Sequence, residues 1–157
     1  MNGYRIAYGK HGDGEPVILI HGTPSHSCIW WNVVPGLVDG GCRVFLFDLL
    51  GYGASERPVD PDVDTSVGGQ EAILLQLMSD WNLDTAHFVA HDIGGAIGQR
   101  FALSHPEKVK SLTLIDTVSY DSWPSETWQQ IIDNGLDDLM REPAAIRLRR
   151  TINFRIS

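Results

Sequence analysis

Cysteine is scarce in this sequence. The 157 residues include only two, Cys28 and Cys42, which are too few for a disulfide framework and show no metal-binding spacing. We therefore expect two reduced, packed thiols, as in a protein of a reducing compartment.

Positive charge is scarce as well. The chain has 12 lysines and arginines against 20 aspartates and glutamates, and its formal net charge is −8. Binding to nucleic-acid phosphates needs a concentration of basic side chains that this composition does not supply, so we expect no nucleic-acid partner. A small-molecule substrate, apolar or uncharged, fits the composition better.

Long hydrophobic runs are also lacking. No segment approaches the roughly 20 consecutive apolar residues that cross a bilayer. The chain starts with Met-Asn-Gly-Tyr-Arg, which is not the basic start and apolar run of a secretion signal. We expect a cytoplasmic protein with no membrane partner. Apolar residues still make up 43% of the chain, which is enough for one core.

Short apolar runs alternate with amphipathic stretches over most of the chain. Strands are predicted at residues 4–8, 16–20, 43–47, 87–90 and 109–115. Helices are predicted at residues 30–37, 66–83 and 94–104. This alternation is typical of an α/β protein with a mostly parallel sheet, helices on both faces, and a ligand site beyond the carboxyl ends of the strands.

Residues 89–95, Val-Ala-His-Asp-Ile-Gly-Gly, lie where a predicted strand meets a predicted helix. Their spacing is that of a nucleophile elbow, in which small residues such as Gly94 and Gly95 flank a strained turn. The central residue is Asp92, and His91 before it is interpreted as structural. A carboxylate with a reference pKa of about 3.9 is already an anion at neutral pH. It can attack an electrophilic carbon directly and form an alkyl ester, which water must then cleave.

Two further motifs accompany the elbow. They are residues 20–24, Ile-His-Gly-Thr-Pro, and residues 48–55, Asp-Leu-Leu-Gly-Tyr-Gly-Ala-Ser. Together and in this order, the three motifs resemble the α/β-hydrolase superfamily, specifically its haloalkane dehalogenase and epoxide hydrolase branch, over residues 4–120. The resemblance implies the α/β-hydrolase fold and a hydrolase that uses Asp92 as its nucleophile, without a metal or an organic cofactor.

The resemblance also implies an oxyanion hole formed by the backbone N–H groups of Thr23 and Ile93. One such donor is typically worth about 3 kcal/mol in the step where water attacks the ester. His21, Gly22 and Pro24 would support this turn, with His21 as a structural brace rather than a base.

Two plainer interpretations are open. Asp92 could be an N-terminal helix cap, although a cap does not account for the paired glycines and the companion motifs. Asp116 ends the strand that follows the elbow. In some dehalogenases a similar position carries the acid that orients the catalytic histidine, whereas serine members of the superfamily commonly have a non-catalytic aspartate there.

The chain departs from its relatives at the substrate site. Haloalkane dehalogenases usually hold the halide with a tryptophan directly after the nucleophile and often an asparagine in the His-Gly-x-Pro turn, where this chain has Ile93 and Thr23. Fluoroacetate dehalogenases place arginines just after the nucleophile, where residues 93–97 read Ile-Gly-Gly-Ala-Ile. These departures weaken the case for either dehalogenase activity. They do not contradict epoxide hydrolysis.

Relatives also continue with a helical cap, further strands and a late histidine that activates water. We therefore predict that residues 1–117 are the N-terminal part of the hydrolase core and that residues 118–157 begin the cap. No histidine follows Asp116. We expect a truncated chain that forms the ester without turning it over and that self-associates through an exposed sheet edge. The alternative is a non-catalytic ligand-binding protein on the same scaffold.

Overall fold

The computed structural model describes residues 3–118 and the single positions 122, 124, 126, 129 and 133. The chain divides into two units, residues 1–119 and 120–157, of which the first is described below. The predicted cap at residues 118–157 lies almost wholly outside the described residues and stays a prediction. Within the described part, no helix is long and apolar enough to cross a membrane.

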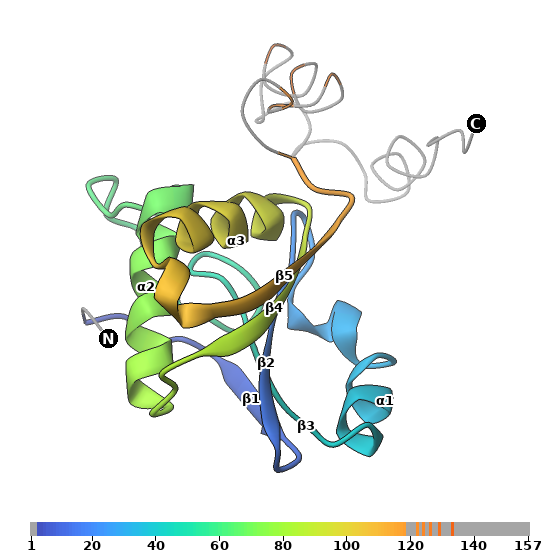
Figure 1. Ribbon diagram of the computed structural model, residues 1–157. Helices are drawn as coiled ribbons and strands as arrows, with labels where there is room; N and C mark the ends of the chain where they lie inside the picture. Colours follow the sequence, from blue (N-terminus) through green and yellow to red (C-terminus); the bar gives the residue numbers. More distant parts are fainter. Residues whose placement is uncertain are drawn as a thin grey trace. The chain divides into compact units, whose positions relative to one another are not determined.

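The described core alternates strands and helices, as the hydrophobic pattern predicted (Figure 1). Its elements are, in order, β1 (Tyr8–His11), β2 (Glu15–Ile20), η1 (Ser27–Trp30), α1 (Val34–Asp39), β3 (Cys42–Phe47), α2 (Val67–Asp80), β4 (Ala86–His91), α3 (Ile93–Ser104), η2 (Pro106–Lys108) and β5 (Val109–Ile115).

The strands form one sheet in the order β1-β3-β2-β4-β5. β1 runs antiparallel to β3, and the other neighbouring pairs are parallel. The prediction of a mostly parallel sheet is therefore confirmed. Because Ile20 of β2 pairs with Ala90 of β4, the loops that leave these two central strands begin side by side. Those loops carry the His-Gly-Thr-Pro turn and the elbow.

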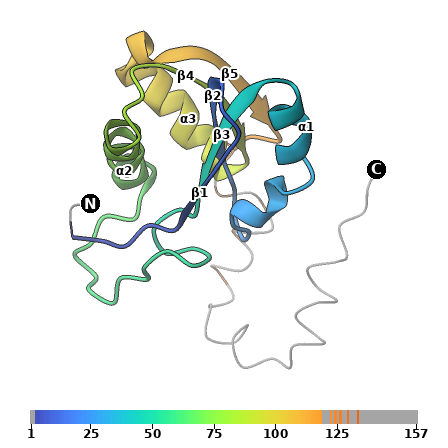
Figure 2. The ribbon, with the colours of Figure 1, turned by 90° about the horizontal axis from the view of Figure 1, so that it is seen from below.

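Helices cover both faces of the sheet (Figure 2). Ile18 and Ile20 belong to a large apolar cluster that also contains side chains of α2 and α3. The alternate residues Val17 and Leu19 belong to a smaller cluster with Val34 of α1. Side chains alternate across a strand, so a strand buried on both faces needs a continuous apolar run, which is what residues 17–20 provide.

Two predicted elements were placed wrongly. The strand predicted at residues 4–8 begins only at Tyr8, since the backbone before it bonds to a loop: Asp48 N donates to Ala7 O at 2.9 Å and Glu56 N to Arg5 O at 2.8 Å. The helix predicted at residues 30–37 is split between η1 and α1. Pro35 lies in the first turn of α1, where backbone N–H groups have no acceptor within the helix, so the missing N–H of proline costs no hydrogen bond. The proline therefore lies at the start of a helix and not near its end.

Candidate active site

Asp92 lies in the turn between β4 and α3 with φ 51° and ψ −124°, a conformation that favours glycine. Such a backbone costs on the order of 1–3 kcal/mol and persists only when its surroundings hold it. Three hydrogen bonds hold this one: Asp92 N donates to Ile115 O at 3.2 Å, and Asp92 O accepts from Gly95 N at 2.9 Å and Val118 N at 3.4 Å. The elbow is therefore anchored to β5 and to the chain that follows it.

The residues around Asp92 must be small because other parts of the chain approach them closely. A Cβ on Gly94 would lie 2.8 Å from the carbonyl oxygen of Ile20, and one on Gly95 would lie 2.7 Å from Cβ of Thr117. Real Cβ atoms essentially never approach other heavy atoms this closely. Strand and helix can therefore close on the elbow only with glycine at both positions.

The carboxylate of Asp92 is bonded across to the neighbouring loop. The backbone N–H of Thr23 donates to Asp92 Oδ2 at 2.7 Å, and the Asp92 side chain makes no capping hydrogen bond to α3. The helix-cap interpretation therefore does not describe this side chain. Ile93 is the first residue of α3, so its N–H belongs to the turn whose donors have no acceptor within the helix.

Gly22 lets the two loops meet. A Cβ at this position would overlap Cβ of Asp92 and lie 2.8 Å from both its Oδ2 and the carbonyl oxygen of His91. Any side chain would therefore push the Thr23 donor away from the carboxylate.

His21 is fully buried and braces this loop. Its Nε2 accepts from Leu49 N at 2.9 Å, so the proton is on Nδ1, which donates to the carbonyl oxygen of Gly22 at 3.0 Å. Burial holds the pKa of His21 below its usual value, against the opposing effects of the Gly22 carbonyl and the Asp48 carboxylate. A neutral ring with both nitrogens engaged is a structural brace rather than a proton acceptor.

Asp48 fastens the same loop to the second motif. Its Oδ1 accepts from Ser27 N and its Oδ2 from Ala54 N, each at 2.8 Å. Burial alone would raise the pKa of Asp48, but the hydrogen bonds from Ser27 and Ala54 outweigh it, and the pKa is lowered. Ser55 adds a bond from its hydroxyl to Asp48 O at 2.6 Å. The buried carboxylate is thus an anion that holds two loops together.

Tyr52 is a site residue to which the sequence interpretation gave no role. Its hydroxyl lies 3.1 Å from the Thr23 hydroxyl, and its ring meets that of His21 edge-on at 5.6 Å. Thr23 therefore carries two polar contacts, its N–H on Asp92 and its hydroxyl on Tyr52. The only signal for Tyr52 was its place within the motif of residues 48–55.

The structure also brings Asp116 next to the elbow. His91 and Ile115 are partners on adjacent parallel strands, so Asp92 and Asp116 each follow one member of a pair. Asp116 is exposed and has φ 41°. Its role in orienting a histidine stays a prediction.

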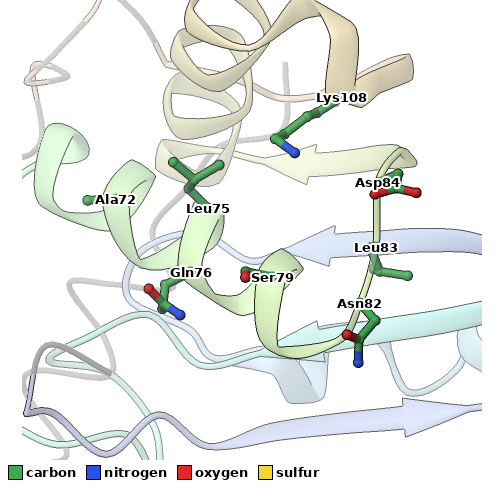
Figure 3. Close-up of a pocket in the computed structure, with 8 residues that line it drawn as sticks. All are labelled: Ala72, Leu75, Gln76, Ser79, Asn82, Leu83, Asp84 and Lys108. Carbon is green, nitrogen blue, oxygen red and sulfur yellow. The ribbon is translucent and has the colours of Figure 1, made fainter.

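Surface hollows lie elsewhere on the core. One of about 670 Å³ runs along α2 to the turn before β4 and is lined by Ala72, Leu75, Gln76, Ser79, Asn82, Leu83, Asp84 and Lys108 (Figure 3). A second of about 310 Å³ lies near Tyr4 and the start of α2. Neither is lined by a residue of the elbow. Among the described residues, no group of three or more His, Cys, Asp or Glu side chains could hold a metal ion.

Comparison with known proteins agrees with this geometry. The family model described as alpha/beta hydrolase fold matches residues 15–151. The chain is 33% identical over 120 residues to a cis-3-alkyl-4-alkyloxetan-2-one decarboxylase of Shewanella oneidensis, covering 76% of this chain and 37% of that protein. It is 35% identical over 136 residues to a haloalkane dehalogenase of Mycolicibacterium smegmatis, covering 82% and 43%. It is 30% identical over 131 residues to bifunctional epoxide hydrolase 2 of Sus scrofa, covering 83% and 23%.

Among solved structures, an alpha/beta hydrolase fold protein from Burkholderia ambifaria superposes with a TM-score of 0.81 at 33% identity, covering 95% of this chain and 53% of that one. The chain thus spans from about a quarter to about half the length of these relatives. The match over residues 15–151, the elbow and the sheet order together show that the chain belongs to the α/β-hydrolase fold family.

Proposed function

We propose that this chain carries the nucleophilic half of a hydrolase in which Asp92 attacks an sp³ carbon of a small, uncharged molecule. The observation that carries the proposal is the 2.7 Å hydrogen bond from Thr23 N to Asp92 Oδ2. It fixes one carboxylate oxygen and leaves Oδ1 for the attack. After attack, Oδ2 is the carbonyl oxygen of the ester, where negative charge develops when water adds. Thr23 N–H is already directed at that atom, and Ile93 N–H would be the second donor.

The leaving group is proposed to be an oxygen held in a strained ring, as in an epoxide. The relatives are named for haloalkanes, an epoxide and an oxetan-2-one, so a halide and a ring oxygen are the two leaving groups to compare. The hydroxyl groups of Thr23 and Tyr52 lie 3.1 Å apart, and the backbone N–H of the same Thr23 is bonded to Asp92. A departing alkoxide needs a hydrogen bond and then a proton, which hydroxyl groups can supply. A departing halide needs no proton, so this pair favours the epoxide.

The ester on Asp92 is expected to persist in this chain. Its cleavage needs a base to activate water, and His21 next to the site has both ring nitrogens engaged. Because the ester is expected to be long-lived, the proposal can be tested by measuring the intact mass of the chain.

The experiment is to incubate the chain, with its exposed Cys28 replaced by serine, with a terminal aryl epoxide or a primary bromoalkane and to record intact mass over time, with Asp92→Asn in the same background as the matched control. We expect one adduct per chain with the epoxide, absent from Asp92→Asn and released by hydroxylamine, which cleaves esters and leaves thioethers intact. Saturable binding without an adduct across both reagents would overturn the proposal in favour of a non-catalytic binding protein.

A further inference from the structure

A second nucleophile lies on η1, in a cluster that the hydrolase chemistry does not use. Cys28 Sγ lies 3.3 Å from Nε2 of His26, and the other ring nitrogen, Nδ1, lies 4.0 Å from Oδ1 of Asp48. The imidazole of His26 therefore faces the thiol with one ring nitrogen and the carboxylate with the other. The sequence-based expectation of two packed thiols is wrong for Cys28, which is exposed, while Cys42 is half-buried.

The order of the three groups suits activation of the thiol. The imidazole can take the thiol proton on Nε2, and a carboxylate facing Nδ1 favours the imidazolium that results. At 4.0 Å the carboxylate is too far for a hydrogen bond but close enough for charge attraction. Asp48 is nearly inaccessible, with a side chain 6% exposed, whereas that of His26 is 49% exposed. The anion is therefore fixed and the base is open to solvent.

The electrostatic surroundings of His26 include Asp48 and His21. Burial lowers the pKa of His21, whose ring is neutral in the folded chain. The hydrogen bonds from Ser27 and Ala54 keep the pKa of Asp48 below its usual value, so this carboxylate is charged wherever a thiol reacts.

We propose that Cys28 is a nucleophilic thiol, activated by His26, that forms mixed disulfides with small-molecule disulfides. The thiolate attacks one sulfur of the disulfide, a new S–S bond forms to Cys28, and the old S–S bond breaks. The Cys28 proton passes to His26 Nε2 and then to the departing thiolate. The modification is reversible by excess thiol. It falls next to Ser27, whose N–H is bonded to Asp48 in the same loop as Thr23.

The site is tested with oxidised glutathione and with the chromogenic disulfide 5,5′-dithiobis(2-nitrobenzoate), on the full chain at neutral pH. The chain has two cysteines, so Cys42→Ser leaves only the thiol under study and Cys28→Ser leaves only the comparison thiol. We expect Cys28 to react about tenfold faster than Cys42 and than free glutathione. Reaction of Cys28 at or below the rate of free glutathione would overturn the proposal without any histidine variant.

The role of the imidazole is tested by His26→Gln in the Cys42→Ser background, with His11→Gln as a control for removing an exposed imidazole elsewhere. We expect His26→Gln to slow mixed-disulfide formation about tenfold and His11→Gln to leave it unchanged. Thermal unfolding of each variant establishes that the fold is retained. Equal rates for His26→Gln and its parent would contradict His26 as the base.

Discussion

The backbone N–H of Thr23 donates a 2.7 Å hydrogen bond to Oδ2 of Asp92, joining two loops that are 69 residues apart in sequence. The bond is possible because β2 and β4 are neighbours and because Gly22 has no side chain between the loops. The bond holds one carboxylate oxygen of the aspartate in the strained elbow, and within residues 3–118 no hydrogen bond holds the other.

Gly22→Ala should separate the two loops. The added Cβ would lie 2.8 Å from Asp92 Oδ2, so we expect a stability loss of about 1–3 kcal/mol. We expect ester formation to slow by at least about tenfold, since a displaced Thr23 no longer holds the carboxylate. Chemical denaturation and the rate of adduct formation measure the two effects.

The control for Gly22→Ala is Gly36→Ala in α1, where a Cβ would meet nothing within 4 Å. This change should leave the adduct rate unaltered and raise stability by up to about 1 kcal/mol, because alanine loses less backbone freedom in a helix than glycine. Similar losses of adduct rate in both variants would show that the close approach at Gly22 is irrelevant.

Thr23→Val should distinguish the opening of an epoxide from the displacement of bromide. It keeps the N–H on Asp92 but removes the hydroxyl that lies 3.1 Å from Tyr52. A hydrogen bond worth about 1 kcal/mol predicts a fall in rate of about fivefold with an epoxide and little change with a bromoalkane. Tyr52→Phe should show the same selectivity. Single-turnover adduct rates decide the matter, and equal losses with both reagents would argue against the hydroxyl pair.

Asp92→Gly should be more stable than Asp92→Ala, and neither variant should form the ester. Glycine adopts φ 51° and ψ −124° without strain, whereas alanine does not. We expect Asp92→Gly to exceed Asp92→Ala in unfolding free energy by about 1–3 kcal/mol. The alanine variant is the matched reference because neither replacement has a carboxylate. Equal stabilities would mean that the elbow stores no strain.

His21 should make stability depend on pH in a defined window. Burial holds its pKa below the ordinary value of 6.5, so below that pH the unfolded chain binds a proton that the folded chain does not. The free energy of unfolding should therefore fall as the pH falls from about 6.5, by at most about 1.4 kcal/mol per pH unit. The carboxylates Glu15, Asp48 and Asp64, whose pKa values are also lowered, act only at more acidic pH.

The variant that isolates this effect is His21→Gln, whose amide oxygen can accept from Leu49 N as the ring does. Its absolute stability is not the readout. The slope of unfolding free energy between about pH 6.5 and pH 5 should be flatter in His21→Gln than in the unsubstituted chain. An unchanged slope in His21→Gln would show that another group titrates in this window.

Local pattern was enough to predict the sheet and the elbow. The apolar run at residues 17–20 demanded burial on both faces, and small residues on both sides of Asp92 demanded a tight strand-to-helix turn. The helix at 30–37 was wrong because Pro35 is compatible with either an end or a beginning.

Contacts between loops could not be predicted from the sequence. The bond from Ser27 N to Asp48 and the contact between the Thr23 and Tyr52 hydroxyl groups depend on how β2 and β3 lie side by side, which no local spacing records. The exposure of Cys28 had no signal either, since a free cysteine is usually buried. The sequence does not show how loops that are distant along the chain are placed relative to one another.

The most direct test locates the adduct. The chain, in a Cys28→Ser background, is quenched rapidly after mixing with an aryl epoxide, digested, and mapped by tandem mass spectrometry beside its Asp92→Asn counterpart. If Asp92 is the nucleophile, the epoxide mass lies on Asp92 as an ester and the asparagine chain carries none. Labelling at any other residue, or equal labelling of the asparagine chain, would contradict the account.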